Sequence, residues 1–176
     1  TPSTFSHKFQ LGWFQIGLKY LKFITLNSEK SARSFNIISK TYFEDKFKNE
    51  NIDSCSYNLF ELNDISEIKN LVNEKNLSGF NVTIPYKESI IPFLDELSDE
   101  AKAIGAVNTV VVRNNKLAGH NTDTFGFKQS VKPFIKNHHE RVLILGTGGA
   151  AKALDYVLQE MGIKTIFVSR NPNSSQ

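Results

Sequence analysis

The chain has 176 residues, of which 40% are hydrophobic and 22% charged, and a net charge of +3. This composition is typical of a globular protein with one or two domains. The charge excess is small and the lysines are scattered, which argues against nucleic acid as a partner. Cys55 is the single cysteine, so the chain forms no internal disulfide and no multi-cysteine metal site, which fits a reducing, cytoplasmic setting. No apolar run approaches the roughly 20 residues of a membrane span.

The first 38 residues differ from the rest of the chain. They contain one acidic residue, Glu29, and an apolar cluster that Lys19 and Lys22 interrupt. We expect residues 1–38 to be an atypical leader, disordered or non-native, and an amphipathic targeting helix is the alternative. Within this segment, Phe23–Leu26 has the composition of a first strand.

From residue 39 onward, helical and strand periodicities alternate. Ser39 or Thr41 is expected to cap a helix that runs to about Glu50, and Asp64 has the spacing of a capping box before a second helix. Further strands are predicted over 56–62, 79–84, 107–113 and 116–118, with a hairpin turn at Asn114-Asn115 and short helices over 87–96 and 98–104. This alternation indicates an α/β sandwich with a largely parallel sheet.

The stretch GFNVTIPYK over residues 79–87 carries polar side chains to the end of a strand. We expect β-branched Val82 and Ile84 on one face and Asn81 and Thr83 on the other. The following proline lacks a backbone donor and ends the strand. Lys87 then lies beyond the strand end, where ligand crevices open in α/β proteins. An ordinary core strand followed by a solvated lysine is the alternative interpretation.

A second unit begins near Glu140. A buried-type strand over 141–145 is followed by GTGGAAKA at 146–153, a helix to about Met161 and a strand over 165–168. In such a βαβ unit the glycines permit a tight turn and close approach to a pyrophosphate at the helix N-terminus. No Gly-Lys-Ser/Thr triplet follows, which excludes the phosphate-binding loop (P-loop) of nucleoside triphosphatases. The predicted cofactor-binding residues of this turn are Gly146, Gly148, Gly149 and Ala150; a turn with a structural role alone is the alternative.

The end of the second strand bears on the choice of cofactor. A NAD site usually places an acidic residue there for the ribose hydroxyls. The chain instead has Ser169 and Arg170, and a guanidinium suits the 2′-phosphate of NADP. We therefore predict NADP as the cofactor, with Ser169 and Arg170 among its binding residues; a solvated loop arginine is the alternative.

Four motifs, taken in order and spacing, resemble the shikimate dehydrogenase family. They are the 79–87 stretch, GAVNT at 105–109, GHNTDTFGF at 119–127 and the glycine-rich turn at 146–153. The resemblance implies a substrate domain over 39–123, a linking helix over 124–139 and a partial Rossmann-like NADP domain over 140–176. It also implies NADPH-dependent reduction of 3-dehydroshikimate to shikimate, a step towards chorismate and the aromatic amino acids.

Matched by position, Lys87 and Asp123 resemble the family's catalytic pair. Reducing a ketone by hydride transfer requires a group that supplies the alcohol proton, and the reverse reaction requires one that accepts it. We treat the two side chains as a coupled pair that shares a proton. A surface ion pair without function is the alternative.

The resemblance also assigns a substrate site. Asn81, Thr83, Asn108 and Asp123 resemble the groups that hold the ring hydroxyls, although Asn108 can equally form a turn or sheet-edge hydrogen bond. Ser39 matches the second serine of a Ser-x-Ser pair that binds the substrate carboxylate, and Ile37 stands in place of the first. The four histidines lack metal-ligand spacing, so we expect no metal site and read them as surface or turn residues.

Both ends of the chain depart from the family pattern. Upstream of Ser39 the resemblance stops, and the chain ends at Gln176, after two strands of the expected cofactor domain. We interpret the sequence as an incomplete or mis-read copy of a functional gene of this family. The expected partners are small molecules, with no nucleic acid or membrane, and the expected assembly is a monomer or homodimer. The alternatives are an inactive or binding-only fragment and a quinate/shikimate dehydrogenase.

Overall fold

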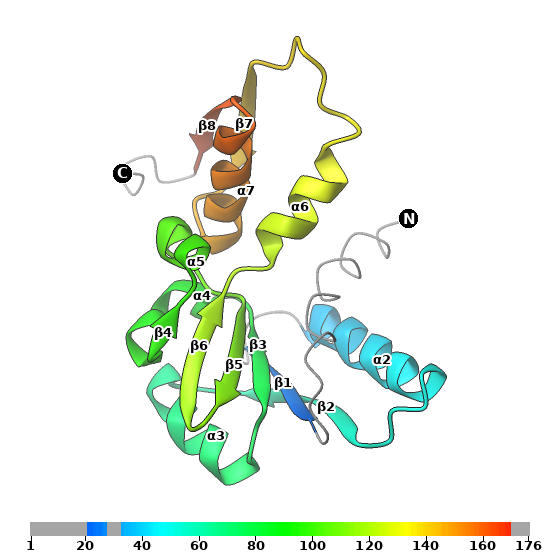
Figure 1. The fold of residues 1–176 in the computed structure, drawn as a ribbon. Coiled ribbons are helices and arrows are strands. Elements are labelled where there is room, and N and C mark those ends of the chain that lie inside the picture. The colour runs from blue at the N-terminus through cyan, green and yellow to red at the C-terminus, as the bar shows by residue number, and fades with distance from the viewer. Residues whose placement is uncertain (1–20, 28–32, 170–176) are drawn as a thin grey trace.

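The computed structural model describes residues 21–27 and 33–169, with side chains from residue 39 (Figure 1). The elements in chain order are β1 (Leu21–Asn27), α2 (Arg33–Asn49), β2 (Cys55–Glu61), the 3-10 helix η2 (Ile65–Glu67), α3 (Ile68–Lys75), β3 (Gly79–Val82), α4 (Tyr86–Ser89), the 3-10 helix η3 (Ile91–Phe93), β4 (Glu96–Leu97), α5 (Asp99–Ile104), β5 (Thr109–Arg113), β6 (Lys116–His120), α6 (Asp123–Val131), β7 (Arg141–Leu145), α7 (Gly149–Glu160) and β8 (Lys164–Val168). In these residues no helix is both long and apolar enough to cross a membrane.

The larger sheet has six strands in the order β2-β1-β3-β5-β6-β4. β5 runs antiparallel to both of its neighbours, and the other pairings are parallel. The expected α/β architecture is therefore confirmed. β1 confirms the strand predicted at Phe23–Leu26, and it lies between β2 and β3, so the sheet begins within the segment expected to be a leader. The domain boundaries at 123/124 and 139/140 stay predictions.

Helices cover this sheet on both faces, and successive side chains of its strands point alternately to the two faces. Phe80 and Val82 of β3 point into the main core, which contains side chains of α3, α5, β5 and β6. Tyr57 of β2 points the other way and packs with Phe43 and Phe47 of α2. Polar Asn81 lies between the two apolar residues of β3 and therefore shares the face of Tyr57. This alternation places an amide side chain beside the aromatic cluster under α2.

The cap expected for the first helix is wrong. α2 begins at Arg33, so Ser39 and Thr41 lie within the helix; no proline or glycine between these positions stops the helix from extending backward. Asp64 is an N-cap, as expected. Its carboxylate accepts a hydrogen bond from the Ser66 backbone N–H at 2.9 Å and caps the 3-10 turn that precedes α3. This bond holds the pKa of the Asp64 carboxyl below its ordinary value.

β3 ends two residues earlier than predicted. Val82 is 2% exposed but Ile84 is 63% exposed, so the two do not share a buried face. The partner strand explains this end: the β3–β5 pairing reaches Asn81 and Thr109, and one further bond joins Val82 N–H to the Asn108 carbonyl at 2.8 Å. Beyond it the chain turns, with the Tyr86 N–H donating to the Thr83 carbonyl at 2.9 Å.

Prolines shorten two further helices. The helix predicted over 87–96 is instead the short α4, the 3-10 turn η3 with Pro92 at its start, and the two-residue strand β4. The helix predicted over 124–139 ends at Val131, two residues before Pro133, because the nitrogen of a proline carries no hydrogen to donate to the preceding turn of a helix. The hairpin turn is confirmed, since Asn114 and Asn115 both have positive φ, at 50° and 59°.

The second unit consists of the parallel pair β7–β8 with α7 packed on one face. Ile144, Leu158 and Ile163 form its core, and Gly146 turns the chain between β7 and α7 with φ +117°, a backbone region that favours glycine. α7 packs against both α6 and α5 (Figure 1). The glycine-rich turn thus lies near the end of the larger sheet that carries Lys87.

Candidate active site

The site is centred on an ion pair between Lys87 and Asp123. Lys87 Nζ donates to Asp123 Oδ2 at 2.5 Å, and the two side chains are only 14% and 21% exposed. Lys87 belongs to α4, just after the β3 turn, and its carbonyl accepts from the Val107 N–H at 2.7 Å. Asp123 is the first residue of α6, where the helix dipole stabilises a carboxylate. The fold therefore brings together the two residues that the sequence predicted as a catalytic pair.

Asn108 holds Asp123 from the other side. Its Nδ2 donates to Asp123 Oδ1 at 2.8 Å and to Thr122 Oγ1 at 3.0 Å. Its Oδ1 accepts from the Thr122 backbone N–H at 2.9 Å and lies 3.2 Å from the Thr122 hydroxyl. These contacts use both donors and both acceptor positions of the amide. Asn108 thus orients the carboxylate; its role as a substrate ligand stays a prediction.

Asn121 fixes the turn into α6. The side chain is 3% exposed. Nδ2 donates to the Ala106 carbonyl at 2.9 Å, and Oδ1 accepts from the Asp123 N–H at 3.1 Å. Thr124 completes the turn by donating to the Asn121 carbonyl at 3.1 Å. These buried hydrogen bonds fix the backbone from which the Asp123 carboxylate projects.

A second series of hydrogen bonds links Asn81 of β3 to side chains of the neighbouring strands. Asn81 Nδ2 donates to the Tyr57 hydroxyl at 2.7 Å, and its Oδ1 accepts from Thr109 Oγ1 at 3.4 Å. Thr109 Oγ1 lies 3.5 Å from Thr122 Oγ1, which joins this chain to the Asn108–Asp123 group. Tyr57 is 2% exposed and stacks on Phe43 at 4.5 Å between ring centroids. Sequence reasoning treated Tyr57 as an apolar strand residue and gave Thr122 no role of its own.

The remaining predicted substrate residues have less defined surroundings. Thr83 is half-buried in the turn after β3, next to Asn81 in the chain. Ser39 is half-buried within α2, the helix that packs on β2 near the opposite edge of the sheet from β4. The roles of both residues in substrate binding stay predictions.

The glycine-rich turn has space for a ligand at two positions. A Cβ on Gly146 or Gly148 would meet no atom within 4 Å, and the 12-residue α7 directs its first backbone N–H groups towards this turn. Gly149 and Ala150 form the first turn of α7. Ser169 follows β8 and is half-buried, whereas Arg170 lies outside the described residues. The open backbone and helix N-terminus fit a pyrophosphate.

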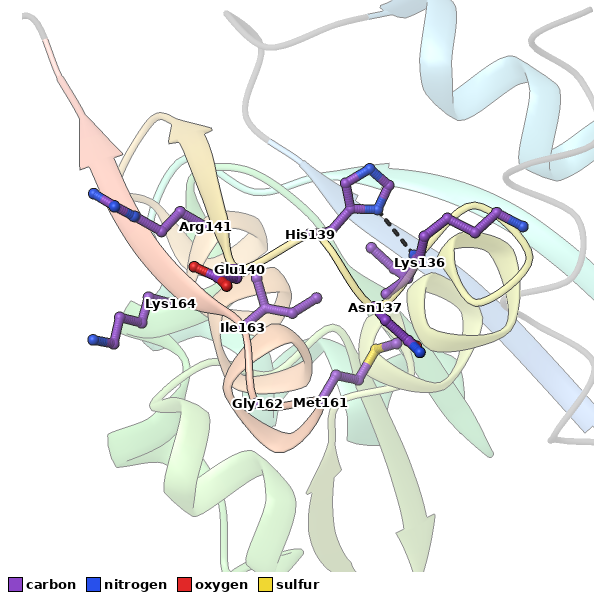
Figure 2. Close-up of a pocket in the computed structure, with 10 residues that line it drawn as sticks. Lys136, Asn137, His139, Glu140, Arg141, Met161, Gly162, Ile163 and Lys164 are labelled. Carbon is purple, nitrogen blue, oxygen red and sulfur yellow. Dashed lines mark hydrogen bonds between the residues drawn. The ribbon is translucent and has the colours of Figure 1, made fainter.

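A cavity of about 650 Å³ lies at the other end of β7 and β8 (Figure 2). It is lined by Met161, Ile163 and several charged side chains of the α6–β7 connection, β7 and β8. Figure 2 shows Lys136 extending in one direction and Arg141 and Lys164 in the opposite one, so their charges do not converge on a common point. Ligands of open α/β sheets bind beyond the carboxyl ends of strands. This cavity is therefore separate from the predicted cofactor site.

The structure describes His120, His138 and His139, whereas His7 lies outside the described residues. Within residues 39–169, no group of three or more His, Cys, Asp or Glu side chains is placed to hold a metal ion. His138 and His139 are exposed. His120 is instead half-buried at the end of β6, and burial, followed by the nearby Arg113, lowers the pKa of its imidazole.

Sequence comparison supports the same interpretation. The family profile described as shikimate dehydrogenase substrate binding domain matches residues 36–110. Residues 36–110 belong to the shikimate dehydrogenase family. A shikimate dehydrogenase (NADP(+)) of Staphylococcus epidermidis is 41% identical over 114 residues, which cover 64% of this chain and 42% of that protein. One from Clostridium botulinum is 46% identical over 125 residues, which cover 68% of this chain and 48% of that protein.

Solved shikimate dehydrogenases share the fold of the chain. Shikimate dehydrogenase 1 from Peptoclostridium difficile matches with a TM-score of 0.79 and 36% identity, covering 89% of this chain and 57% of that structure. The Thermus thermophilus shikimate 5-dehydrogenase in complex with NADP(H) and shikimate matches with a TM-score of 0.74 and 30% identity, covering 88% and 58%. The chain thus spans less than two thirds of the length of these relatives.

Proposed function

We propose that the protein is an NADP-dependent shikimate dehydrogenase that reduces 3-dehydroshikimate to shikimate, reversibly, in aromatic amino acid biosynthesis. The observation that carries this proposal is the Lys87–Asp123 pair at 2.5 Å, set beside Asn81 and Asn108 and near a dinucleotide-type turn. The Thermus thermophilus relative was solved with NADP(H) and shikimate. The proposal places the reaction in the cytoplasm, with small-molecule partners only and a monomer or homodimer as the assembly.

In this proposal, Lys87 and Asp123 exchange a proton with the substrate oxygen. During reduction the pair supplies the proton that converts the carbonyl oxygen into a hydroxyl; during oxidation it accepts that proton. Asn108 keeps Asp123 oriented through the 2.8 Å bond to Oδ1, so Oδ2 stays with the Lys87 amine. When bound, NADPH supplies the hydride.

Substrate binding is assigned to neutral polar groups and one serine. Asn81 and Thr83 lie at the end of β3 and offer donors and acceptors to ring hydroxyls. Ser39 is proposed to bind the carboxylate. The backbone around Gly146, Gly148, Gly149 and Ala150, with Ser169 and Arg170, is proposed to bind NADP. The open space at Gly146 and Gly148 supports the first part of this cofactor site.

The test is a shikimate-plus-NADP assay that follows NADPH formation. Lys87→Ala is expected to lower turnover by about 10²–10⁴-fold, the usual contribution of a positioned acid–base group. Lys116→Ala is the matched control, because Lys116 forms an ion pair with Glu96 at 3.2 Å but is 66% exposed on β6. Equal turnover in the unmodified chain and Lys87→Ala would refute the assignment of Lys87.

Two further measurements separate the alternatives. Binding of shikimate in calorimetry without NADPH formation would indicate a binding-only protein. Faster turnover of quinate than of shikimate, or of NAD than of NADP, would indicate a quinate/shikimate dehydrogenase.

A further inference from the structure

Gly149 is crowded where its neighbours in the glycine-rich turn are open. A Cβ at this position would lie 3.0 Å from the Ala106 Cβ, 3.1 Å from the Lys87 Cβ and 3.5 Å from the Lys87 Cδ. Nothing lies within 4 Å of a Cβ at Gly148. The first turn of α7 therefore packs directly on the aliphatic part of the Lys87 side chain at Gly149.

The atoms under Gly149 cannot easily move. The Lys87 carbonyl accepts from the Val107 N–H at 2.7 Å. Ala106 is fully buried, and its carbonyl accepts from Asn121 Nδ2 at 2.9 Å. Asn121 in turn holds the backbone N–H of Asp123. Gly149 of α7 thus contacts the backbone segments that position both Lys87 and Asp123.

Two further contacts hold α7 in this place. Lys152, three residues after Gly149, pairs with Glu88 at 2.6 Å, and Glu88 is the residue that follows Lys87. One turn along the same face of the helix, Ala153 is fully buried in a cluster with Ile104 and Ala106. α7 is therefore fastened to α4 and α5 on both sides of the Gly149 contact.

We propose that Gly149 is a positioning residue that lets α7 hold the Lys87 side chain against Asp123. The proposal rests on the proposed function in so far as Lys87 acts on substrate. It gives Gly149 a role that is present without cofactor and differs from close approach to a pyrophosphate. An alanine at this position displaces α7 from Lys87 by a few tenths of an ångström and loosens the amine in its ion pair.

The test measures how accessible the Lys87 amine is in the cofactor-free chain. Limited acetylation with acetic anhydride, followed by peptide mass spectrometry, gives the labelling rate of each lysine. Lys46 is the internal reference, because its side chain is also 14% exposed and it also pairs at 2.5 Å, with Glu50 on α2. The ratio of Lys87 to Lys46 labelling cancels changes in overall stability.

Gly149→Ala is expected to raise the Lys87-to-Lys46 ratio by about three- to fivefold, because a displacement of a few tenths of an ångström weakens the ion pair without breaking it. Gly148→Ala is the matched control: its position is open and its φ of −77° suits alanine, so the ratio should stay at the unmodified value. An unchanged ratio in Gly149→Ala, or an equal rise in both variants, would overturn the proposal.

Failure of this proposal and failure of the proposed function give different results. The labelling ratio is measured without substrate or cofactor, so it reports positioning even in a chain that shows no turnover. A chain that forms NADPH normally while Gly149→Ala leaves the labelling ratio unchanged would keep the function and refute the positioning role.

Discussion

The Lys87–Asp123 pair should be worth more to stability than an ion pair on the surface. Replacing Lys87 with Met removes the donor at 2.5 Å from Oδ2 of the Asp123 carboxylate, which is 21% exposed and keeps the Asn108 bond to Oδ1. Replacing Asp123 with Asn removes the charge but keeps the shape of the side chain. The two single variants and the double variant form a mutant cycle that isolates the pair.

The expected coupling energy is about 1–3 kcal/mol. Exposed pairs give about 0–1 kcal/mol because solvent screens them, and breaking a fully buried pair costs about 3–5 kcal/mol. Side chains that are 14% and 21% exposed lie between these limits, nearer the buried one. The additional hydrogen bond from Asn108 fixes the carboxylate, so less side-chain entropy is lost when the pair forms.

The assay is urea unfolding of the four proteins at pH 7, with the free energy of unfolding taken from each transition. The matched control cycle uses Lys116→Met and Glu96→Gln, a pair at 3.2 Å whose side chains are 66% and 59% exposed. Its coupling should stay below about 1 kcal/mol. Equal coupling in the two cycles would refute the argument that burial sets the strength of the Lys87–Asp123 pair.

Three other predictions concern the frame around the site. Gly119→Ala should cost about 1–3 kcal/mol in urea unfolding, because its Cβ would lie 2.6 and 2.8 Å from two leucine side chains; unchanged stability would contradict this packing. Tyr86→Phe should cost about 1–3 kcal/mol, because the buried hydroxyl donates to the Leu62 carbonyl; a neutral effect would mean that water replaces the bond. The folded-state pKa of His120 is lowered, so its contribution to stability is present above the unfolded pKa of 6.5 and is lost as the pH falls from there through the lowered folded pKa. His120→Asn should therefore flatten the loss of stability between about pH 7 and pH 5, and an unchanged slope in the variant would contradict this.

Local sequence patterns predicted the elements whose geometry depends on neighbouring residues. The Asn114-Asn115 turn needs two residues that tolerate positive φ, and the glycine-rich turn needs Gly146 at φ +117°; both requirements are visible in the sequence. Helix and strand ends were less accurate. Ile84 was predicted as a strand residue because it is β-branched. The strand ends earlier, where the partner strand stops pairing, and the position of a partner strand cannot be read from the local sequence pattern.

The candidate site was predicted as a set of residues, and their arrangement was not. Motif resemblance placed Lys87 and Asp123 together, and the geometry agrees, although their roles remain predictions. The hydroxyl of Tyr57 was missed because its partner, Asn81, is 24 residues away in the chain. A tyrosine in an alternating strand gives no local sign that its hydroxyl, rather than its ring, contacts a polar group across the sheet.

The polar residues of the candidate site come together only when the strands of the larger sheet are assembled. Tyr57 and Asn81 are 24 residues apart, and Lys87 and Asp123 are 36 residues apart. Contacts between residues so far apart in the chain carry an entropic cost of loop closure. The contacts within the assembled β2-β1-β3-β5-β6 sheet offset that cost. A small molecule that bridges Asn81 and Lys87 would therefore bind only the folded sheet and raise the stability of the whole sheet by mass action. The thermal unfolding midpoint of the chain can thus report ligand binding even where no reaction is observed.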